Sequence, residues 1–258
     1  MKKVVVGTGW WCAEQPHEWT IGSPHTRAQA FFETWRSQVL ECIAPDIIHV
    51  TDSASPLKPP RHDRLPGVVW TSLDRNYGHA NDIRTGKIKT KYSGFTRSVL
   101  LGAAYAMMCD ATHYVYVEQD CLVFGRDFLS AAIGTSDADI FLGMPTENGL
   151  GLSGIAAPMI QQSVMIVRKA GLERFICQML SPPHSDGEIS PEETMRQFLP
   201  PFDFLKVPYG RSRPIDPLSA HFYAQHLSEA ELELIRPRMA APNARRSRWP
   251  FHLRSRRS

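Results

Sequence analysis

Apolar and polar positions change period along this chain, and the changes predict strands separated by helices. Short runs rich in β-branched and aromatic residues predict buried strands at residues 3–6, 46–51, 68–71, 113–117, 139–142 and 163–167. Apolar residues at helical spacing predict helices at residues 27–43, 95–109, 126–133, 169–180 and 191–199, with Thr26 as the cap of the first. This alternation predicts one α/β domain with a mixed, mostly parallel sheet flanked by helices.

The end of the first strand carries the first candidate binding residues. Gly7-Thr8-Gly9 follows the apolar run directly, so we expect a turn there. Gly7 and Thr8 match the start of a dinucleotide-binding fingerprint, although its third glycine is missing. Trp10 and Trp11 come next, and either could stack on a ring of a ligand or belong to the core.

Two carboxylates follow the strand at residues 113–117. Glu118 and Asp120 lie at positions i and i+2, which places both side chains on one side of an extended chain. Ligands of α/β sheets bind beyond the carboxyl ends of strands. Hard oxygen ligands suit Mg²⁺ or Mn²⁺ bound to a diphosphate. The alternative interpretation is a strand that ends in a solvated acidic turn.

The distribution of charge along the chain is more informative than the net charge. The chain has 258 residues, 29 Lys plus Arg, 26 Asp plus Glu, and a net charge of +3. Residues 244–258 contain six arginines and no acid, so the body at residues 1–243 is slightly acidic and we expect no nucleic-acid partner. We expect a disordered tail that could touch anionic lipid. No apolar stretch is long enough for a membrane span, and the first residues lack the apolar region and cleavage site of a signal peptide. The five cysteines form no CxxC pair, and we expect them to be reduced thiols. We therefore expect a cytoplasmic protein, peripheral at most at the membrane's cytoplasmic face.

The acidic segment resembles a known family. Val117-Glu118-Gln119-Asp120, followed by Asp127-Phe128-Leu129, is similar to the DxD region of GT-A glycosyltransferases, and its first acid resembles the Glu-Asp-Asp motif of the N-acetylglucosaminyltransferase I family. The resemblance implies that Asp120 binds the metal and that Glu118 helps to hold the nucleotide. Gln119 departs from the acid usual at that position.

Two segments before the acids resemble family 2 glycosyltransferases. Residues 46–55 are similar to the segment whose Asp recognises the nucleotide base, which implies that role for Asp52; an Asx turn is the alternative. Residues 94–106 resemble the family's helix with an Arg on its first turn, which implies that Arg97 faces the diphosphate. The loop before Arg97 is basic, and a solvated loop is the alternative interpretation of its lysines.

Three segments after the acids extend the resemblance. The glycines at residues 149–154 resemble the acceptor-side loop. Glu192 and Glu193 lie where inverting enzymes carry a catalytic base, with Glu193 as first candidate, although Ser190-Pro191-Glu192-Glu193 is also an ordinary helix start. His221, ahead of His226, matches the place of a further metal ligand.

Together these segments predict a GT-A-like domain over residues 1–243. The resemblance implies a hexosyl- or N-acetylhexosaminyltransferase that moves a sugar from a nucleotide-sugar donor, with UDP-sugar favoured, to a hydroxyl of a glycan, lipid-linked or protein acceptor. It implies inversion and assistance by Mn²⁺ or Mg²⁺. Two alternatives remain open: a nucleotidyltransferase that acts on sugar phosphates, and a non-catalytic module that binds through the basic tail.

Overall fold

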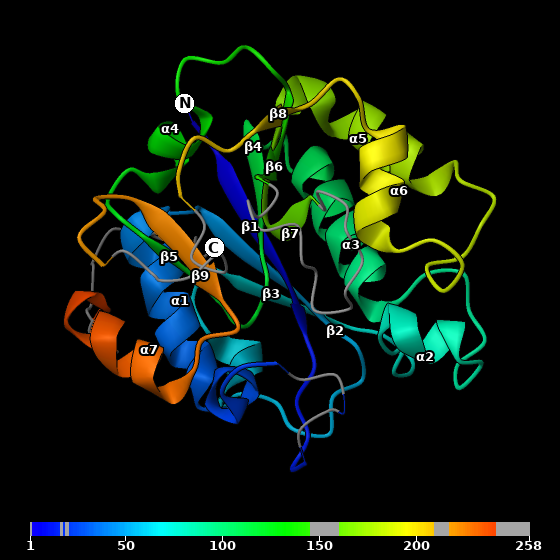
Figure 1. Cartoon of the computed structure of the whole chain (residues 1–258), viewed down its shortest axis with the longest axis horizontal. Helices are drawn as coiled ribbons and strands as arrows, with labels where there is room; N and C mark the ends of the chain where they lie inside the picture. The colour runs from blue at the N-terminus through cyan, green and yellow to red at the C-terminus, as the bar shows by residue number, and fades with distance from the viewer. Residues whose placement is uncertain (1, 16–17, 19–20, 145–159, 209–216, 241–258) are drawn as a thin grey trace, which may run out of the picture.

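The chain folds around a seven-stranded mixed sheet with strand order β3-β2-β1-β4-β7-β6-β8 (Figure 1). The structure is a computed structural model and describes residues 2–15, 18, 21–144, 160–208 and 217–240. Neighbouring strands are parallel except around β7, which is antiparallel to both β4 and β6. The strands of this sheet are β1 (Val4–Trp10), β2 (Ile47–Asp52), β3 (Val68–Ser72), β4 (His113–Val117), β6 (Ile140–Gly143), β7 (Gln161–Arg168) and β8 (Asp203–Phe204). The mostly parallel α/β sheet predicted from the sequence is confirmed.

A two-stranded ribbon and the helices complete the domain. The ribbon pairs β5 (Cys121–Phe124) with the antiparallel β9 (Phe222–Gln225). The α-helices are α1 (Phe31–Cys42), α2 (Ala80–Arg84), α3 (Gly94–Met108), α4 (Phe128–Ile133), α5 (Leu172–Leu180), α6 (Pro191–Phe198) and α7 (Glu229–Ile235). The short 3₁₀ helices are η1 (Pro24–Arg27), η2 (His62–Arg64), η3 (Lys169–Gly171) and η5 (Arg236–Arg238).

The sheet separates two apolar clusters. Val4 and Val6 of β1 belong to a cluster with α1, α4 and the β5–β9 ribbon, whereas Val5 belongs to one with α3 and α5. Figure 1 shows α1 and the ribbon on one side of the sheet and α3, α5 and α6 on the other. Because both faces are covered, the central strands are apolar on both sides. This burial supplies the main driving force for folding.

The first strand is longer than the sequence pattern indicates. The turn expected at Gly7-Thr8-Gly9 is wrong, because β1 continues through these residues to Trp10. The glycines serve close packing instead: a Cβ atom on Gly7 would lie 2.5 Å from the hydroxyl of Tyr114, and one on Gly9 would lie 2.8 Å from Oγ of Ser98. The third glycine of a phosphate-binding turn is absent because no such turn exists there.

Other differences lie where the local pattern is weak. The first helix begins at Phe31, and Thr26 is buried in η1, whose cap is Ser23. The polar connection before α3 contains α2, and the segment after α6 contains β8, β9 and α7, none of which was predicted. All five cysteines are free thiols, as expected. Among the described residues, no helix has the length and apolar character that crossing a membrane requires.

Candidate functional site

The predicted acidic motif forms the connection between β4 and β5. The amide of Glu118 donates to the carbonyl of Ser163 on β7 (2.9 Å), and the amide of Cys121 donates to the carbonyl of Glu118 (3.0 Å). Trp35 of α1 donates from Nε1 to the same Glu118 carbonyl (3.0 Å). The turn is thus fixed by the sheet and by α1, and its side chains begin at the carboxyl end of β4.

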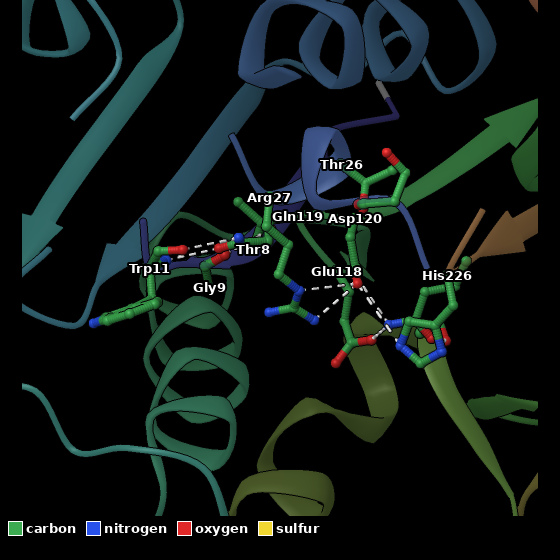
Figure 2. A network of polar contacts seen from close by, with 12 residues as sticks. Thr8, Gly9, Trp11, Thr26, Arg27, Glu118, Gln119, Asp120 and His226 are labelled. Atoms are coloured by element: carbon green, nitrogen blue, oxygen red, sulfur yellow. Dashed lines mark hydrogen bonds and ion pairs between the residues drawn. The ribbon is translucent and has the colours of Figure 1, made fainter. Parts of the chain in front are cut away.

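Asp120 is fully buried and joins segments that are far apart in the sequence (Figure 2). Its Oδ2 accepts from Nη2 and Nε of Arg27 in η1, at 2.8 and 3.1 Å. Its Oδ1 accepts from Nε2 of Gln225 at the end of β9 (2.9 Å). Nε2 of His226 lies 3.7 Å from Oδ2. Among the described residues, these hydrogen-bond and ion-pair partners of the carboxylate all present nitrogen atoms to it.

These contacts determine the ionisation of Asp120 and Arg27. Burial acts most strongly on Asp120 and would raise its pKa, but the charges of Arg27 and His226 and the hydrogen bonds outweigh burial, so the pKa lies below its usual value. For Arg27, burial acts to lower the pKa, and the carboxylates of Asp120 and Glu118 more than compensate, so the pKa is raised. The pair is therefore ionised at neutral pH.

Gln225 brings the two predicted carboxylates together. Its Nε2 donates to Oε2 of Glu118 as well as to Oδ1 of Asp120. Its Oε1 accepts from the hydroxyl of Ser163 on β7 (2.5 Å). The two carboxylates on one side and the hydroxyl on the other fix the orientation of this amide.

Gln119, between the two acids, holds the end of β1. The Trp11 amide donates to Oε1 of Gln119 (2.7 Å), and Nε2 of Gln119 donates to the Trp11 carbonyl (3.0 Å). Figure 2 shows the Trp11 indole directed away from Gln119. Trp10 instead lies in the core, where it packs on Phe32. An acid at position 119 could not donate to that carbonyl, so the glutamine that departs from the resembled motif has a structural reason.

Asp52 lies at the same edge of the sheet, at the carboxyl end of β2 and opposite Trp10. It is fully buried. Its Oδ1 accepts from the Ser55 amide (2.9 Å), and its Oδ2 contacts Nζ of Lys58 (2.9 Å) and the Ser72 hydroxyl (3.0 Å). These contacts close the turn after β2, as the Asx-turn alternative describes. Recognition of a base by Asp52 would require one of them to open.

Arg97 contacts residues of the segment before α3, and Gly7 and Thr8 are enclosed within the sheet. Arg97 donates from Nε to the Tyr92 carbonyl (3.2 Å) and from Nη2 to the Thr90 hydroxyl (3.0 Å), and its guanidinium lies 3.6 Å from the centre of the Tyr77 ring. Gly7 packs on Tyr114, and Thr8 is buried within β1. The structure does not bring Arg97 into contact with Glu118 or Asp120. The predicted roles of Arg97, Gly7 and Thr8 in donor binding stay predictions.

Glu192 and Glu193 lie in the first turn of α6 and form hydrogen bonds with different partners. Glu193 accepts from Arg196 and Gln197 of its own helix, and these contacts, with the Arg196 hydrogen bond first, lower its pKa. Glu192 instead accepts from Nε2 of Gln162 on β7 (2.8 Å). Gln162 adjoins Ser163, which contacts both Glu118 and Gln225. Of the two, Glu192 is therefore the one connected to the acidic turn.

The two histidines considered as ligands lie at opposite ends of β9. His221 precedes Phe222, which pairs with Phe124, and its Nε2 lies 2.7 Å from the carbonyl of Arg126. His226 follows Gln225, which pairs with Cys121 beside Asp120. The structure thus places His226, the second choice from the sequence, near the carboxylates and His221 at the far end of the ribbon.

The described residues do not fit a divalent cation at Asp120. Within the described ranges, no group of three or more His, Cys, Asp or Glu side chains could hold a metal ion. Oδ2 of Asp120 already accepts two hydrogen bonds from Arg27, and Oδ1 accepts one from Gln225. A cation needs lone pairs on oxygen, and here N–H donors take both of those on Oδ2 and one of those on Oδ1. The expected Mn²⁺ or Mg²⁺ stays a prediction.

The sequence alone did not single out three members of this network. Arg27 lay in the predicted first helix, Gln225 lay in a region without a clear pattern, and Gln162 was part of a predicted strand border. No local signal marks them, because their partners are remote in the sequence. The predicted acceptor loop at residues 149–154 and the basic tail at residues 244–258 lie outside the described residues.

Comparison with known proteins gives structural likenesses only. No protein-family model and no curated protein sequence matches the chain. A candidate glucose-1-phosphate thymidylyltransferase from Bacillus anthracis, in complex with a sucrose, aligns with a TM-score of 0.49 and 8% identity over 92% of this chain and 94% of its own. S. aureus TarS 1–349 in complex with UDP aligns with a TM-score of 0.47 and 14% identity over 86% of this chain and 60% of its own. The galactosyltransferase LgtC, in complex with donor and acceptor sugar analogs, aligns with a TM-score of 0.37 and 13% identity over 80% and 68%. At these low scores the function must be argued from the site itself.

Proposed function

We propose that the chain is a GT-A-like glycosyltransferase that moves a sugar from a nucleotide-sugar donor to a hydroxyl of a glycan, lipid-linked or protein acceptor. A UDP-sugar is the favoured donor. One observation carries the proposal. Charged and polar side chains from η1, from the turn between β4 and β5 and from β9 converge at the carboxyl edge of the sheet, beside the end of β1. This is the edge where α/β sheets bind nucleotides and related ligands.

Within this proposal Glu192 is the catalytic base for inverting transfer. The acceptor hydroxyl attacks the anomeric carbon, the bond from that carbon to the diphosphate oxygen breaks with its electron pair on the diphosphate, and the hydroxyl proton passes to the carboxylate. Gln162 orients Glu192. Oε1 of Gln162 is buried and accepts no hydrogen bond from the described residues, so it suits a second hydroxyl of a sugar acceptor, one other than the attacking hydroxyl. Glu193, held by Arg196 and with a lowered pKa, is the weaker base.

A nucleotide panel tests the proposal. Thermal shifts are measured with UDP-, GDP-, CMP- and dTDP-linked sugars, each with EDTA and with Mn²⁺, and release of nucleoside diphosphate is then followed for the ligand that binds. We expect stabilisation by one nucleotide and diphosphate release in the presence of an acceptor. Release of pyrophosphate from a nucleoside triphosphate and a sugar phosphate would instead indicate a nucleotidyltransferase. No shift with any nucleotide would indicate a non-catalytic module.

The two neighbouring acids supply a matched pair of variants. Glu192→Gln should lower kcat by about 10²- to 10⁴-fold with little change in donor affinity, because general-base catalysis is of that size. Glu193→Gln, with the same change in charge one residue away, should keep kcat within about 3-fold, because it removes only an exposed pair with Arg196. The reverse ranking would move the catalytic base to Glu193.

A further inference from the structure

The cation that the structure supplies to Asp120 is a guanidinium. Arg27 places both Nε and Nη2 on Oδ2, and Gln225 takes Oδ1. The Asp120 side chain is fully buried. A metal ion that bound Oδ2 would have to displace Arg27, because its two N–H groups take both lone pairs of that oxygen.

Arg27 itself is accessible. Its side chain is 34% exposed, whereas Asp120 is 0% exposed. Two of its three guanidinium nitrogens are used by Asp120, and Nη1 makes no hydrogen bond within the described part of the chain. Figure 2 shows this third nitrogen directed away from Asp120. The guanidinium therefore has one edge fixed by a buried carboxylate and another edge open.

The surroundings keep this arrangement in place. Ser163 donates to Gln225, so the Gln225 amide turns its N–H groups toward the carboxylates rather than its oxygen. Arg27 ends η1, whose first residues are fixed by the Ser23 cap and by the buried Thr26. A positive group that is held in advance needs little reorganisation when an anion arrives, which is the condition for strong electrostatic stabilisation.

We propose that Arg27, positioned by Asp120, supplies the charge that binds the donor's diphosphate, so that donor binding and transfer need no divalent cation. This inference rests on the proposed function and gives Asp120 the role of a positioning residue. The open edge of a guanidinium can donate two hydrogen bonds to phosphate oxygens, a geometry that an ammonium group cannot reproduce. As the sugar–oxygen bond breaks, the same group stabilises the charge that collects on the leaving diphosphate.

The test measures binding of UDP and of uridine by calorimetry, in EDTA and in millimolar Mn²⁺, for the full chain. We expect the Kd for UDP to change by less than about 3-fold between the two conditions. Arg27→Lys should weaken UDP binding by at least about 10-fold, because one charge-assisted hydrogen-bond pair is lost, and should leave uridine binding unchanged. Arg126→Gln, which removes an exposed arginine paired with Glu41, is the control and should leave UDP binding unchanged.

A second variant keeps the test independent of folding. Arg27→Gln leaves the buried Asp120 without its cation and could unfold the protein, so it is combined with Asp120→Asn. The double variant removes both charges and keeps a polar side chain at each position. The double variant should keep a cooperative thermal transition and bind uridine but not UDP. UDP binding that is lost in EDTA, or unchanged in Arg27→Lys, would overturn the inference and leave the proposed function intact. Failure of every nucleotide to bind in either condition would overturn the proposed function itself.

Discussion

Asp52 and Asp120 are the same residue type, equally buried, at the same edge of one sheet, yet their partners differ in kind. Asp52 contacts Ser55, Lys58 and Ser72, all within its own turn or the next strand. Asp120 contacts Arg27 and Gln225, at sequence separations of 93 and 105 residues. A carboxylate whose partners are local shapes a loop, whereas one whose partners are remote assembles a site. Burial alone does not distinguish the two.

The largest expected effect is that of Asp120→Ala. Turnover should fall by about 100-fold or more, because Arg27 loses the group that orients it. The free energy of unfolding should fall by about 2 kcal/mol, less than for a fully buried pair because Arg27 is partly exposed. Steady-state kinetics and urea denaturation measure the two effects. Full turnover in this variant would show that Asp120, like Asp52, has only a structural role.

Acidification separates the contribution of Asp120 to stability from the contributions of two buried histidines, because these groups titrate at different pH. Burial lowers the pKa of His49 on β2 and, with Lys2 and Arg168, that of His113 on β4, each to about 4. The unfolded chain then binds more protons, so stability falls as the pH drops from about 6.5 to 4, by about 1–2 kcal/mol for each histidine between pH 7 and 5. Urea denaturation at several pH values measures the loss, and His49→Asn should reduce it.

Asp120 acts at lower pH. Its pKa is depressed, so its stabilising contribution is complete above its unfolded value of about 3.9 and is lost as the pH falls through the lower folded value. The Asp120→Asn variant should therefore lose less stability than the wild type below about pH 4. A difference confined to the range between about pH 6.5 and 5 would assign the effect to the histidines instead.

The smallest expected effect is that of Asp52→Asn. Asparagine keeps an oxygen for the Ser55 amide and loses the charge that faces Lys58, so we expect about 1 kcal/mol of destabilisation and turnover within about 3-fold. Calorimetry with UDP and with inorganic diphosphate decides between a loop role and base recognition. A 10-fold loss for UDP alone would show that Asp52 leaves its turn to read the base, and the comparison with Asp120 would no longer hold.

The sequence predicted those parts of the fold that have a local cause. The apolar run at residues 113–117 correctly predicted β4, because a buried strand must be apolar. The acids after it correctly predicted a polar turn, because residues at the edge of the sheet need not be apolar. Ser190-Pro191 gave the start of α6 through the preferences of helix N-termini. Such signals lie within a few residues of the feature they predict.

The remaining features depend on contacts between distant segments. Gly7 and Gly9 read as a turn, but they are glycines because Tyr114 and Ser98 pack against them from other elements. The strand β9 is only four residues long and its pattern is too short to recognise, so Gln225 could not be placed beside Asp120. Arg27 gave no signal because an arginine near a helix start is ordinary. A single sequence contains no record of such pairings.

The bridge made by Gln225 has a consequence for how the protein is synthesised. The growing chain produces Arg27 first, the two carboxylates about a hundred residues later, Ser163 next, and Gln225 last of these. Until β9 pairs with β5, the two negative charges lack the amide that holds them side by side. The polar network around Asp120 should therefore assemble only after Gln225 has been synthesised. Long-range closure of this kind is slow. A ribosome-stalled intermediate that ends before residue 222 would contain all seven strands of the sheet without the Gln225 bridge.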